Sequence, residues 1–448
     1  MSSVSLDAKQ IVRNMIYNKK YNMMSLIGLN FKISPIFSGI IVFQNIIEGI
    51  LPTLLTITVS KFIDVIVDDS AIRVVYRSLL MIIIVMVAQF GVSIVFSVVH
   101  RKLKIDLQRV CEYEGIKRVA SLEYRYIESK MEYENTSRVI SGFSEYVYIS
   151  YQMMLMILVL LVRVSGILLI FVNTEVKWIG VVIVLFTIPV FCVSYKSGEK
   201  IYNFYKSSFE NELEMNHQTH ILKSRDVVDE RTLFEFSRKI GIKWGVLRND
   251  YFNRQNKMNK KIEIQLKIPF IVSWVIVGFL ILPMLQSFFL NNITIGLFIS
   301  MCNNMIDLNT SINTTFSSLS SQIAKTKSFI YDLNSFINYK YDETYLVKPH
   351  TKSKPFETLE FINVSFKYPG TNRKVLNNMS FKIENGNTYA FTGKNGSGKS
   401  TIIKLIIGLY KDYSGEILLN GMNIREYKEA DIKSMFAVLF QDYAKYQI

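Results

Sequence analysis

The residues best suited to chemistry stand near the C-terminal end of the sequence, where residues 393 to 401 read GKNGSGKST. This stretch fits G-x-x-x-x-G-K-[ST], a phosphate-binding loop whose glycines let backbone N–H groups fold inward around phosphate oxygens. Lys399 is placed to reach the β- and γ-phosphates, and the Ser400 hydroxyl to ligate a magnesium ion. The sequence therefore predicts a nucleotide-binding loop made of Gly393, Lys394, Asn395, Gly396, Ser397, Gly398, Lys399, Ser400 and Thr401.

The segments on either side of this loop have the patterns that the motif requires. The apolar run YAFTG leads into the loop, and TIIKLIIGLY leaves it with apolar residues at helical spacing. A further apolar run, LEFINVSF, lies upstream. We therefore predict that the loop joins a strand to the N-terminus of a helix, where N–H groups favour an anion.

The rest of the chain has the composition of a membrane protein. Of its 448 residues, 50% are hydrophobic, and charged residues make up 20%, against about 25% in typical soluble domains. Six apolar runs have the length of about 20 residues that a helix needs to cross a bilayer. We place them at Pro35–Val59, Leu79–Val99, Met153–Val172, Trp178–Tyr195, Ile268–Phe289 and Ile293–Phe316, the last being the most polar.

The charges between the predicted spans indicate an orientation. Long basic connections follow the second and fourth spans, whereas the short connection after Val59 carries Asp64, Asp68 and Asp69, and the one after Phe289 has no Lys or Arg. Positive charge near the ends of spans marks the cytoplasmic side. We therefore expect a multi-pass protein of the cell membrane with both termini in the cytoplasm. Abundant Lys, Asn, Ile and Tyr indicate an AT-rich, bacterial genome, so the membrane expected is a bacterial inner membrane.

The sequence does not predict nucleic-acid binding, a cleavable signal peptide or a zinc site. The net charge of +15 follows the membrane pattern rather than one basic face, so we expect membrane lipids and no nucleic acid as partners. Residues 1–32 have the pattern of an amphipathic helix on the membrane interface, without the features of a cleavable signal peptide. The three cysteines and four histidines form no zinc-binding pattern; the cysteines are Cys111, Cys192 and Cys302.

The combination of six spans, basic cytoplasmic extensions and a phosphate-binding loop resembles an ATP-binding cassette (ABC) exporter half-transporter. That resemblance implies ATP and Mg²⁺ as ligands and a second half-transporter, identical or different, as partner. FINVSFKYPG is similar to the strand that ends in the family's adenine-stacking aromatic, here Tyr368, and residues 414–427 to a strand pair. AVLFQD is similar to the segment whose glutamine, here Gln441, senses magnesium and the attacking water.

This sequence also departs from the family's pattern in one respect. The family's signature loop, acidic strand and switch histidine have no counterpart after Gln441, so we expect an incomplete nucleotide-binding domain. The predicted domains are 1–32 interfacial helix, 33–338 six-span membrane domain, 339–354 linker and 355–448 the front part of a nucleotide-binding domain. We expect residues 355–448 alone to fold poorly and not to hydrolyse ATP, because YAFTG and Ile402, Ile403, Leu405 and Ile406 would lack cover.

Two features of the membrane part bear on transport. By resemblance, residues 121–135 and 223–236 contain short coupling helices that dock on nucleotide-binding domains, with a solvated helical turn as the alternative. Glu48, Arg163 and Asp307 lie inside predicted spans, so each is expected to face the bundle interior or a watery cavity. They either contact cargo or pair with one another.

The fold class expected is an all-α membrane exporter domain of six helices followed by an incomplete α/β P-loop domain. Its expected function is ATP-driven export of an unidentified lipid, peptide or drug-like substrate. The alternative is a non-hydrolysing membrane protein with a regulatory or degenerate role. The sequence opens without the early cysteine that would mark a leader-cleaving peptidase domain, so none is expected.

Overall fold

The computed structural model describes residues 20–68, 71–172, 174, 176–225, 227–341 and 355–439. Its contacts divide the chain into two compact units, described here one at a time. The first unit comprises residues up to Cys111 together with Gly142–Asn334, and the second comprises Glu112–Ser141 and the residues from Ser335 onward. The helices α4, α6 and α10 each have a part in both units.

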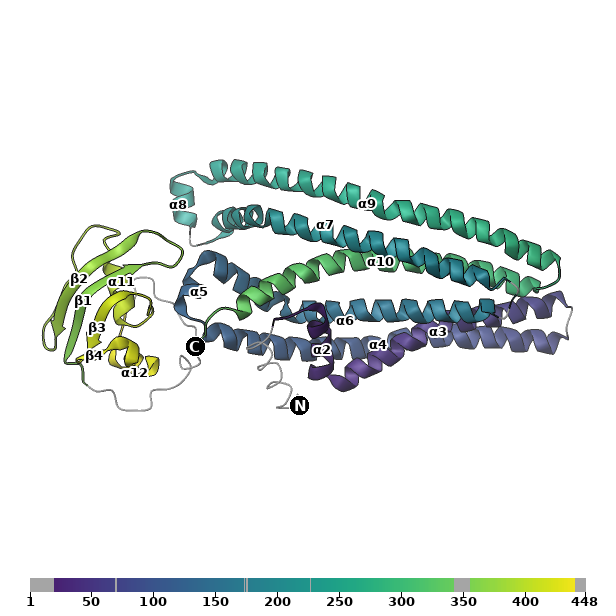
Figure 1. Ribbon diagram of the computed structural model, residues 1–448, viewed down its shortest axis with the longest axis horizontal. Helices are drawn as coiled ribbons and strands as arrows, with labels where there is room; N and C mark the ends of the chain where they lie inside the picture. Colours follow the sequence, from purple (N-terminus) through teal and green to yellow (C-terminus); the bar gives the residue numbers. More distant parts are fainter. Residues whose placement is uncertain are drawn as a thin grey trace. The chain divides into compact units, whose positions relative to one another are not determined.

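The first unit is helical. Its elements are α2 (Met23–Ile33), α3 (Pro35–Val67), α4 (Ile72–Ala120), α6 (Lys130–Val172), α7 (Trp178–Lys223), α8 (Val228–Leu233), α9 (Ser237–Phe289) and α10 (Ile295–Ile337). Figure 1 shows the six long helices of this unit running side by side along a common direction. Each predicted span lies within one of these helices, apart from the first two residues of the sixth.

Short-range chemistry explains where several helices begin and continue. Asn22 accepts a hydrogen bond from the Ser25 backbone N–H while the Ser25 hydroxyl accepts one from Asn22, a reciprocal cap that starts α2. Pro35 occupies the first turn of α3, where its missing N–H costs nothing. Proline inside α3, α7 and α9 is tolerated as in membrane helices, where neighbouring groups satisfy the freed carbonyls.

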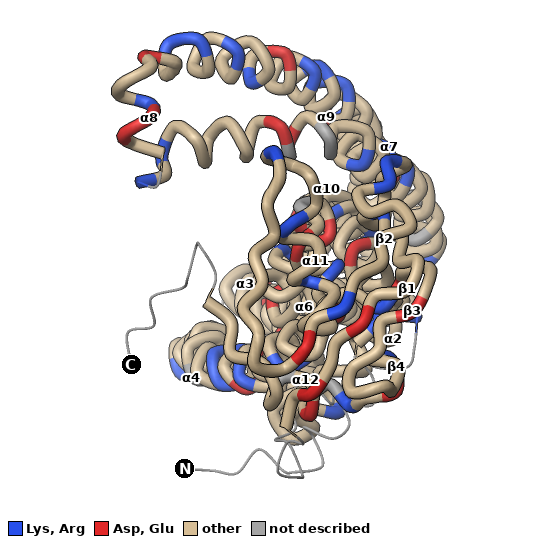
Figure 2. The backbone as a smooth tube through the Cα atoms, turned by 90° about the vertical axis from the view of Figure 1, so that its left-hand side faces the viewer, with Lys and Arg blue, Asp and Glu red and all other residues tan. Residues whose placement is uncertain are grey.

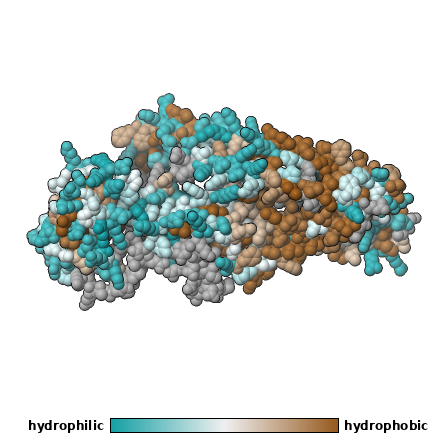
Figure 3. Space-filling model, in the orientation of Figure 1, coloured by the Kyte–Doolittle hydropathy of each residue, from teal (hydrophilic) through white to brown (hydrophobic). Residues whose placement is uncertain are grey.

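Five helices of the described residues are long and apolar enough to cross a membrane. They are Pro35–Val67, Ile72–Ala120, Met131–Val172, Trp178–Ser208 and Ser237–Phe289. The sixth predicted span gives α10, a helix of 43 residues that is too polar for this group. Figure 3 shows a hydrophobic band over the long helices, and Figure 2 shows Lys and Arg repeated along α9 next to α8.

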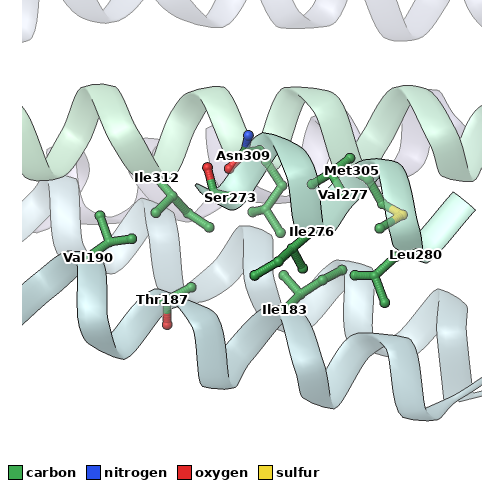
Figure 4. Close-up of a pocket in the computed structure, with 11 residues that line it drawn as sticks. Ile183, Thr187, Val190, Ser273, Ile276, Val277, Leu280, Met305, Asn309 and Ile312 are labelled. Atoms are coloured by element: carbon green, nitrogen blue, oxygen red, sulfur yellow. The ribbon is translucent and has the colours of Figure 1, made fainter. Parts of the chain in front are cut away.

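Helices α6, α7, α9 and α10 share one buried core. Met284 of α9 and Ile179 of α7 are fully buried, and they belong to the same cluster as Met301 and Met305 of α10. Where α7, α9 and α10 meet, a cavity of about 30 Å³ is lined by Ile183 and other largely apolar side chains (Figure 4). That volume is about the share of one water molecule in the liquid, so this part of the bundle is well packed.

The second unit contains a small antiparallel sheet in the order β2-β1-β3-β4. Its elements are α5 (Tyr124–Glu128), β1 (Thr358–Lys367), β2 (Lys374–Glu384), α11 (Lys399–Ile406), β3 (Ser414–Leu419), β4 (Met422–Asn423), a 3₁₀ turn (Ile424–Glu426) and α12 (Glu429–Met435). The predicted strand LEFINVSF is β1, the pair at 414–427 is β3 with β4, and the helix after the loop is α11, so these predictions are confirmed.

Alternation along β1 fixes which side of the sheet is buried. Leu359 and Phe361 are buried, and a bulge at Asn363, with φ of 49°, shifts the alternation so that Val364 and Phe366 are buried as well. Figure 1 shows α11 and α12 on one side of this sheet. Their apolar residues join those of β1 and β3 in one core.

Candidate nucleotide-binding site

The phosphate-binding loop lies directly before α11, whose first residue is Lys399 and whose N-cap is Gly398. The Ile402 backbone N–H donates to the Gly398 carbonyl over 3.0 Å, which closes the first turn of the helix. Within the loop, the Ser397 N–H donates to the Lys394 carbonyl over 3.2 Å. The free N–H groups of the first helical turn therefore open toward the loop, as an anion site requires.

The loop glycines fit a phosphate cradle. Gly396 and Gly398 have φ angles of 79° and 97°, a region that side chains disfavour. A Cβ on Gly398 would lie 2.7 Å from Leu376 Cδ2, and a Cβ on Gly393 would lie 2.8 Å from Ser397 Oγ. The loop can hold this close path only with glycine at these positions, so the residues present fit a nucleotide.

The two side chains predicted to act on phosphate and magnesium lie at the start of α11. Lys399 Nζ donates to the carbonyls of Gly393 and Lys394 over 2.7 and 2.9 Å, so its ammonium lies against the loop backbone. Ser400 is the second residue of the helix and is exposed. Asn395 is exposed in the turn between Lys394 and Ser397.

Tyr368, the predicted adenine-stacking aromatic, follows the end of β1 and reaches the same helix. Its hydroxyl lies 2.9 Å from Thr401 Oγ1, and Thr401 is 4% exposed. The ring meets Phe366 and Tyr410 edge to face, and the Lys404 ammonium lies 5.6 Å from its centre. The structure thus brings Tyr368 together with the loop residues, while Gln441 lies outside the described residues.

Two predictions about the surroundings of the loop are wrong. Residues 387–393 form no strand, and Tyr389 and Phe391 are 44% and 36% exposed, because no described strand pairs with this segment. In contrast, Ile402, Leu405 and Ile406 of α11 are at most 7% exposed, since β1 and β3 cover them; Ile403 is 36% exposed. Strands β1 and β3 supply the cover that we had expected to be missing for Ile402, Leu405 and Ile406.

Helix α5, which connects α4 to α6, contacts α11 within the second unit. The Glu128 carboxylate accepts hydrogen bonds from Lys404 Nζ and from the Tyr410 hydroxyl. Tyr124 meets Tyr410 edge to face at 5.7 Å, and Arg125 pairs with Asp412 at 3.3 Å. Helix α5 lies inside the segment 121–135 that was expected to hold a coupling helix, and α8 lies inside 223–236.

Lys404 is the centre of this contact, and its charge is favoured there. Burial acts to lower its pKa, but the hydrogen bond and the charge of Glu128 raise it, and the net effect is a raised pKa. Sequence reasoning missed Lys404, Tyr410 and Glu128 as site residues. The only sequence signal was a basic residue on the loop helix and an acidic residue in the connection, 276 positions apart.

Known proteins are similar to this chain in sequence. Residues 376–447 match the family model described as ABC transporter. The subtilin transport ATP-binding protein SpaT of Bacillus subtilis is 24% identical over 90% of this chain and 66% of its own length. An ATP-dependent lipid A-core flippase of Haemophilus influenzae is 47% identical over 18% of this chain and 14% of its own length. The chain thus spans less than two thirds of either relative.

A solved structure shares the fold. It is described as a bacterial Atm1-family ABC exporter with ATP bound, and it superposes with a TM-score of 0.68 at 16% identity, over 88% of this chain and 69% of its own. The superposition extends through the long helices as well as the sheet region. The chain therefore contains an ABC transporter domain and has the fold of an ABC exporter, in which a helical membrane domain is fused to a nucleotide-binding domain.

Proposed function

We propose that the protein is one half of a dimeric, ATP-driven exporter that moves a lipid, peptide or drug-like cargo across a bacterial inner membrane, with both termini in the cytoplasm. The observation that carries this proposal is the contact of Glu128 with Lys404. It joins the connection between two long membrane helices to the helix that begins at the phosphate-binding loop. The names of SpaT and the flippase, which are both transport proteins, add support.

In this proposal, some residues of the chain bind the nucleotide and others transmit a movement of α11 to α5. The loop N–H groups and Lys399 bind the phosphates, and Lys399 exchanges its two carbonyl acceptors for phosphate oxygens. Ser400 is placed for magnesium, and Tyr368 offers its ring to the base. When bound, ATP supplies the phosphoanhydride bond whose cleavage drives the cycle. Any shift of α11 moves Lys404 and therefore acts on α5.

The partner in this proposal is a second half-transporter, identical or different, facing this one. Relatives of this type work as dimers, and the second copy supplies the groups that complete each nucleotide site. The alternative of a non-hydrolysing membrane protein gains no support from the relatives, because both are named for transport or ATP-dependent movement.

Replacing Lys399 tests the proposal. In the full-length protein reconstituted with its partner in lipid vesicles, Lys399→Ala should lower ATP hydrolysis by about 100-fold or more, since one preorganised phosphate contact is lost. Transport should fall with it, while membrane insertion and helical content stay unchanged. The measurements are phosphate release and circular dichroism.

The matched control is Lys382→Ala, which removes an exposed lysine of β2 whose salt bridge to Glu384 lies at the surface. Its hydrolysis rate should equal that of the unmodified protein. If Lys399→Ala hydrolyses ATP as fast as Lys382→Ala, this loop is not the working site and the exporter proposal fails.

A further inference from the structure

Helix α10 carries a polar row along one side. The residues recur every three or four positions, so they lie on one face of the helix. They are Ser300, Asn303, Asn304, Asp307, Thr310, Ser311 and Thr314. This row explains why α10 is too polar to stand among the five apolar helices. A carboxylate and several amides at membrane depth are costly unless water, protein or a ligand covers them.

The polar row faces a cavity of about 580 Å³. The other walls come from α3, through Pro52, Leu55, Thr56 and Val59, from α4 through Gln89, and from α6 through Arg163. Arg163 Nη1 donates to Ser311 Oγ over 3.0 Å, so its guanidinium is held at the polar row. Arg163 and Asp307, two of the charges predicted inside spans, therefore line the same cavity.

Several polar groups of this wall have unused hydrogen-bonding capacity. Ser300 is 2% exposed and Asn304 is 7% exposed, yet Ser300 Oγ and Asn304 Nδ2 have no hydrogen-bond partner among the described residues. Arg163 Nε is also buried without one. Burying such groups unpaired costs about 1–3 kcal/mol each, but these atoms have almost no accessible surface. The exposed side chains of the polar row, and therefore the ones open to a ligand, are Asn303, Asp307, Thr310 and Thr314.

The two charges of the cavity are also available. Within the described residues, neither Arg163 nor Asp307 takes part in an ion pair, although both line the same cavity. Glu48, the third charge inside the predicted spans, does not line this cavity; its carboxylate accepts a hydrogen bond from Gln44 over 2.8 Å. A cation and an anion separated by amides and hydroxyls form a surface complementary to a zwitterion.

The other cavities of the unit differ in kind. The cavity in Figure 4 has room for about one water molecule. A third cavity, of about 770 Å³, is lined by side chains of α3, α6 and α10 such as Ile46, Leu54 and Leu169 and includes no charged residue. Among these three, the cavity at the polar row alone combines ligand-sized volume with charges of both signs.

We propose that this cavity binds a zwitterionic polar group of the cargo, with its anionic end at Arg163, its cationic end at Asp307 and its hydrogen-bonding groups along the polar row of α10. This proposal rests on the exporter function and names the chemistry of what is carried. The zwitterion can belong to a short peptide or to a lipid headgroup, because both combine an anion and an ammonium within one polar group.

Charge-selective thiol labelling tests the site without a known cargo. In full-length protein whose Cys111, Cys192 and Cys302 are replaced, Thr310→Cys is treated with anionic or cationic methanethiosulfonate reagents of similar size. Arg163→Gln should slow the anionic reagent about fivefold and Asp307→Asn the cationic one equally, the factor expected for one unit charge at close range in water. Mass spectrometry gives the rates.

Ile306→Cys is the matched control, since Ile306 is the neighbour of Asp307 on α10 but does not line the cavity. Its rates should be the same with and without the two charge changes. The proposal would be overturned if Thr310→Cys did not react, or if its labelling rates were unchanged by both Arg163→Gln and Asp307→Asn.

Protection by added compounds identifies the source of the zwitterion. Triglycine with free termini and lysophosphatidylcholine are each compared with a neutral counterpart, acetyl-triglycine amide and palmitoylglycerol respectively. At least one zwitterion should slow labelling of Thr310→Cys, and the neutral counterparts should not. Equal protection by a neutral counterpart, or none by either zwitterion, contradicts the assignment.

The outcome is separable from that of the exporter proposal. Labelling and protection need no ATP, so they should persist in a Lys399→Ala background. Loss of hydrolysis with normal charge-selective labelling tests only the nucleotide loop. Normal ATP hydrolysis without charge-selective labelling would contradict only the proposed cargo site.

Discussion

At the residue scale, Gly398 ends the phosphate-binding loop in a conformation that other residues resist. Its φ of 97° is combined with a close neighbour, because a Cβ would lie 2.7 Å from Leu376 Cδ2, which would have to shift. Gly370 has a similar φ of 74° but open space around it. Comparing substitutions at Gly398 and Gly370 therefore distinguishes the cost of backbone strain from the cost of steric overlap.

We expect Gly398→Ala to lower the free energy of unfolding by about 2–4 kcal/mol, and Gly370→Ala by about 1–2 kcal/mol. The first value adds steric overlap to the cost of positive φ that both share. Denaturant unfolding of the full-length protein, followed by fluorescence, measures both. A Gly398→Ala protein as stable as Gly370→Ala would show that the loop relaxes around the added methyl group.

At the scale of elements, two ion pairs of different burial join α5 to α11 and to the segment between α11 and β3. The side chains of Glu128 and Lys404 are 32% and 20% exposed, whereas Asp412, the partner of Arg125, is 78% exposed. The first pair also includes the Tyr410 hydroxyl. It should therefore contribute more, since exposed pairs contribute little.

We expect Glu128→Gln to weaken the contact by about 1 kcal/mol and to lower transport several-fold without changing ATP affinity. Asp412→Asn, the control at the same contact, should change neither. Transport assays and nucleotide titrations in vesicles distinguish them. Equal effects of the two variants would show that the buried pair has no special part in transmission.

The same contact has a defined pH dependence. Because Glu128 raises the pKa of Lys404 above its ordinary value of 10.5, the stabilisation is fully present below that value and is lost as pH rises through the folded-state pKa. The stability difference between Glu128→Gln and the unmodified protein should be constant from about pH 7 to 9 and shrink above about pH 10.5. A difference that grows with pH would contradict the assignment.

A second set of contacts holds the end of α4 against the last residue of α10 and the residues that follow it. Arg118 is fully buried, and its Nη2 donates to the Ile337 carbonyl over 2.6 Å. Its guanidinium also lies 4.6 Å from the centre of the Tyr341 ring, and the Glu123 N–H donates to the Lys340 carbonyl. The planar, multidentate guanidinium suits carbonyls and rings together.

Arg118→Ala should therefore lower the free energy of unfolding by about 2–4 kcal/mol, because buried carbonyls lose their donor. Arg118→Lys should recover less than half of this loss. Arg109→Ala, at an exposed position of the same helix, should change stability by about 0.5 kcal/mol or less. Thermal unfolding ranks the three variants by stability. An Arg118→Ala protein as stable as the unmodified protein would show that the contacts of Arg118 do not stabilise the fold.

At the scale of the whole molecule, the orientation in the membrane remains a prediction from the basic connections. In a background without native cysteines, Asp68→Cys and Leu290→Cys should react with a membrane-impermeant maleimide added outside intact cells, since acidic or uncharged connections face outward. Lys117→Cys and Lys239→Cys should react only after the membrane is opened. External labelling of Lys239→Cys would overturn the six-span assignment.

Local patterns determined much of this protein. Glycine spacing and the lysine after it predicted the loop, because those residues act through the backbone path that they permit. Continuous apolar runs predicted the long helices, because a helix must be apolar over about 20 residues to cross a bilayer, and the resemblance to the exporter family predicted β1. The assignment of YAFTG to a strand failed because a strand needs a partner, which an apolar run by itself does not supply.

Only the tertiary structure decided which distant residues meet. It covered Ile402, Leu405 and Ile406 with β1 and β3, and it brought Glu128 to Lys404 across 276 positions. It also gathered Arg163 and the polar row of α10 around one cavity. The physical reason is that periodicity specifies which side of an element is polar or apolar, whereas its partner depends on packing among all the elements at once.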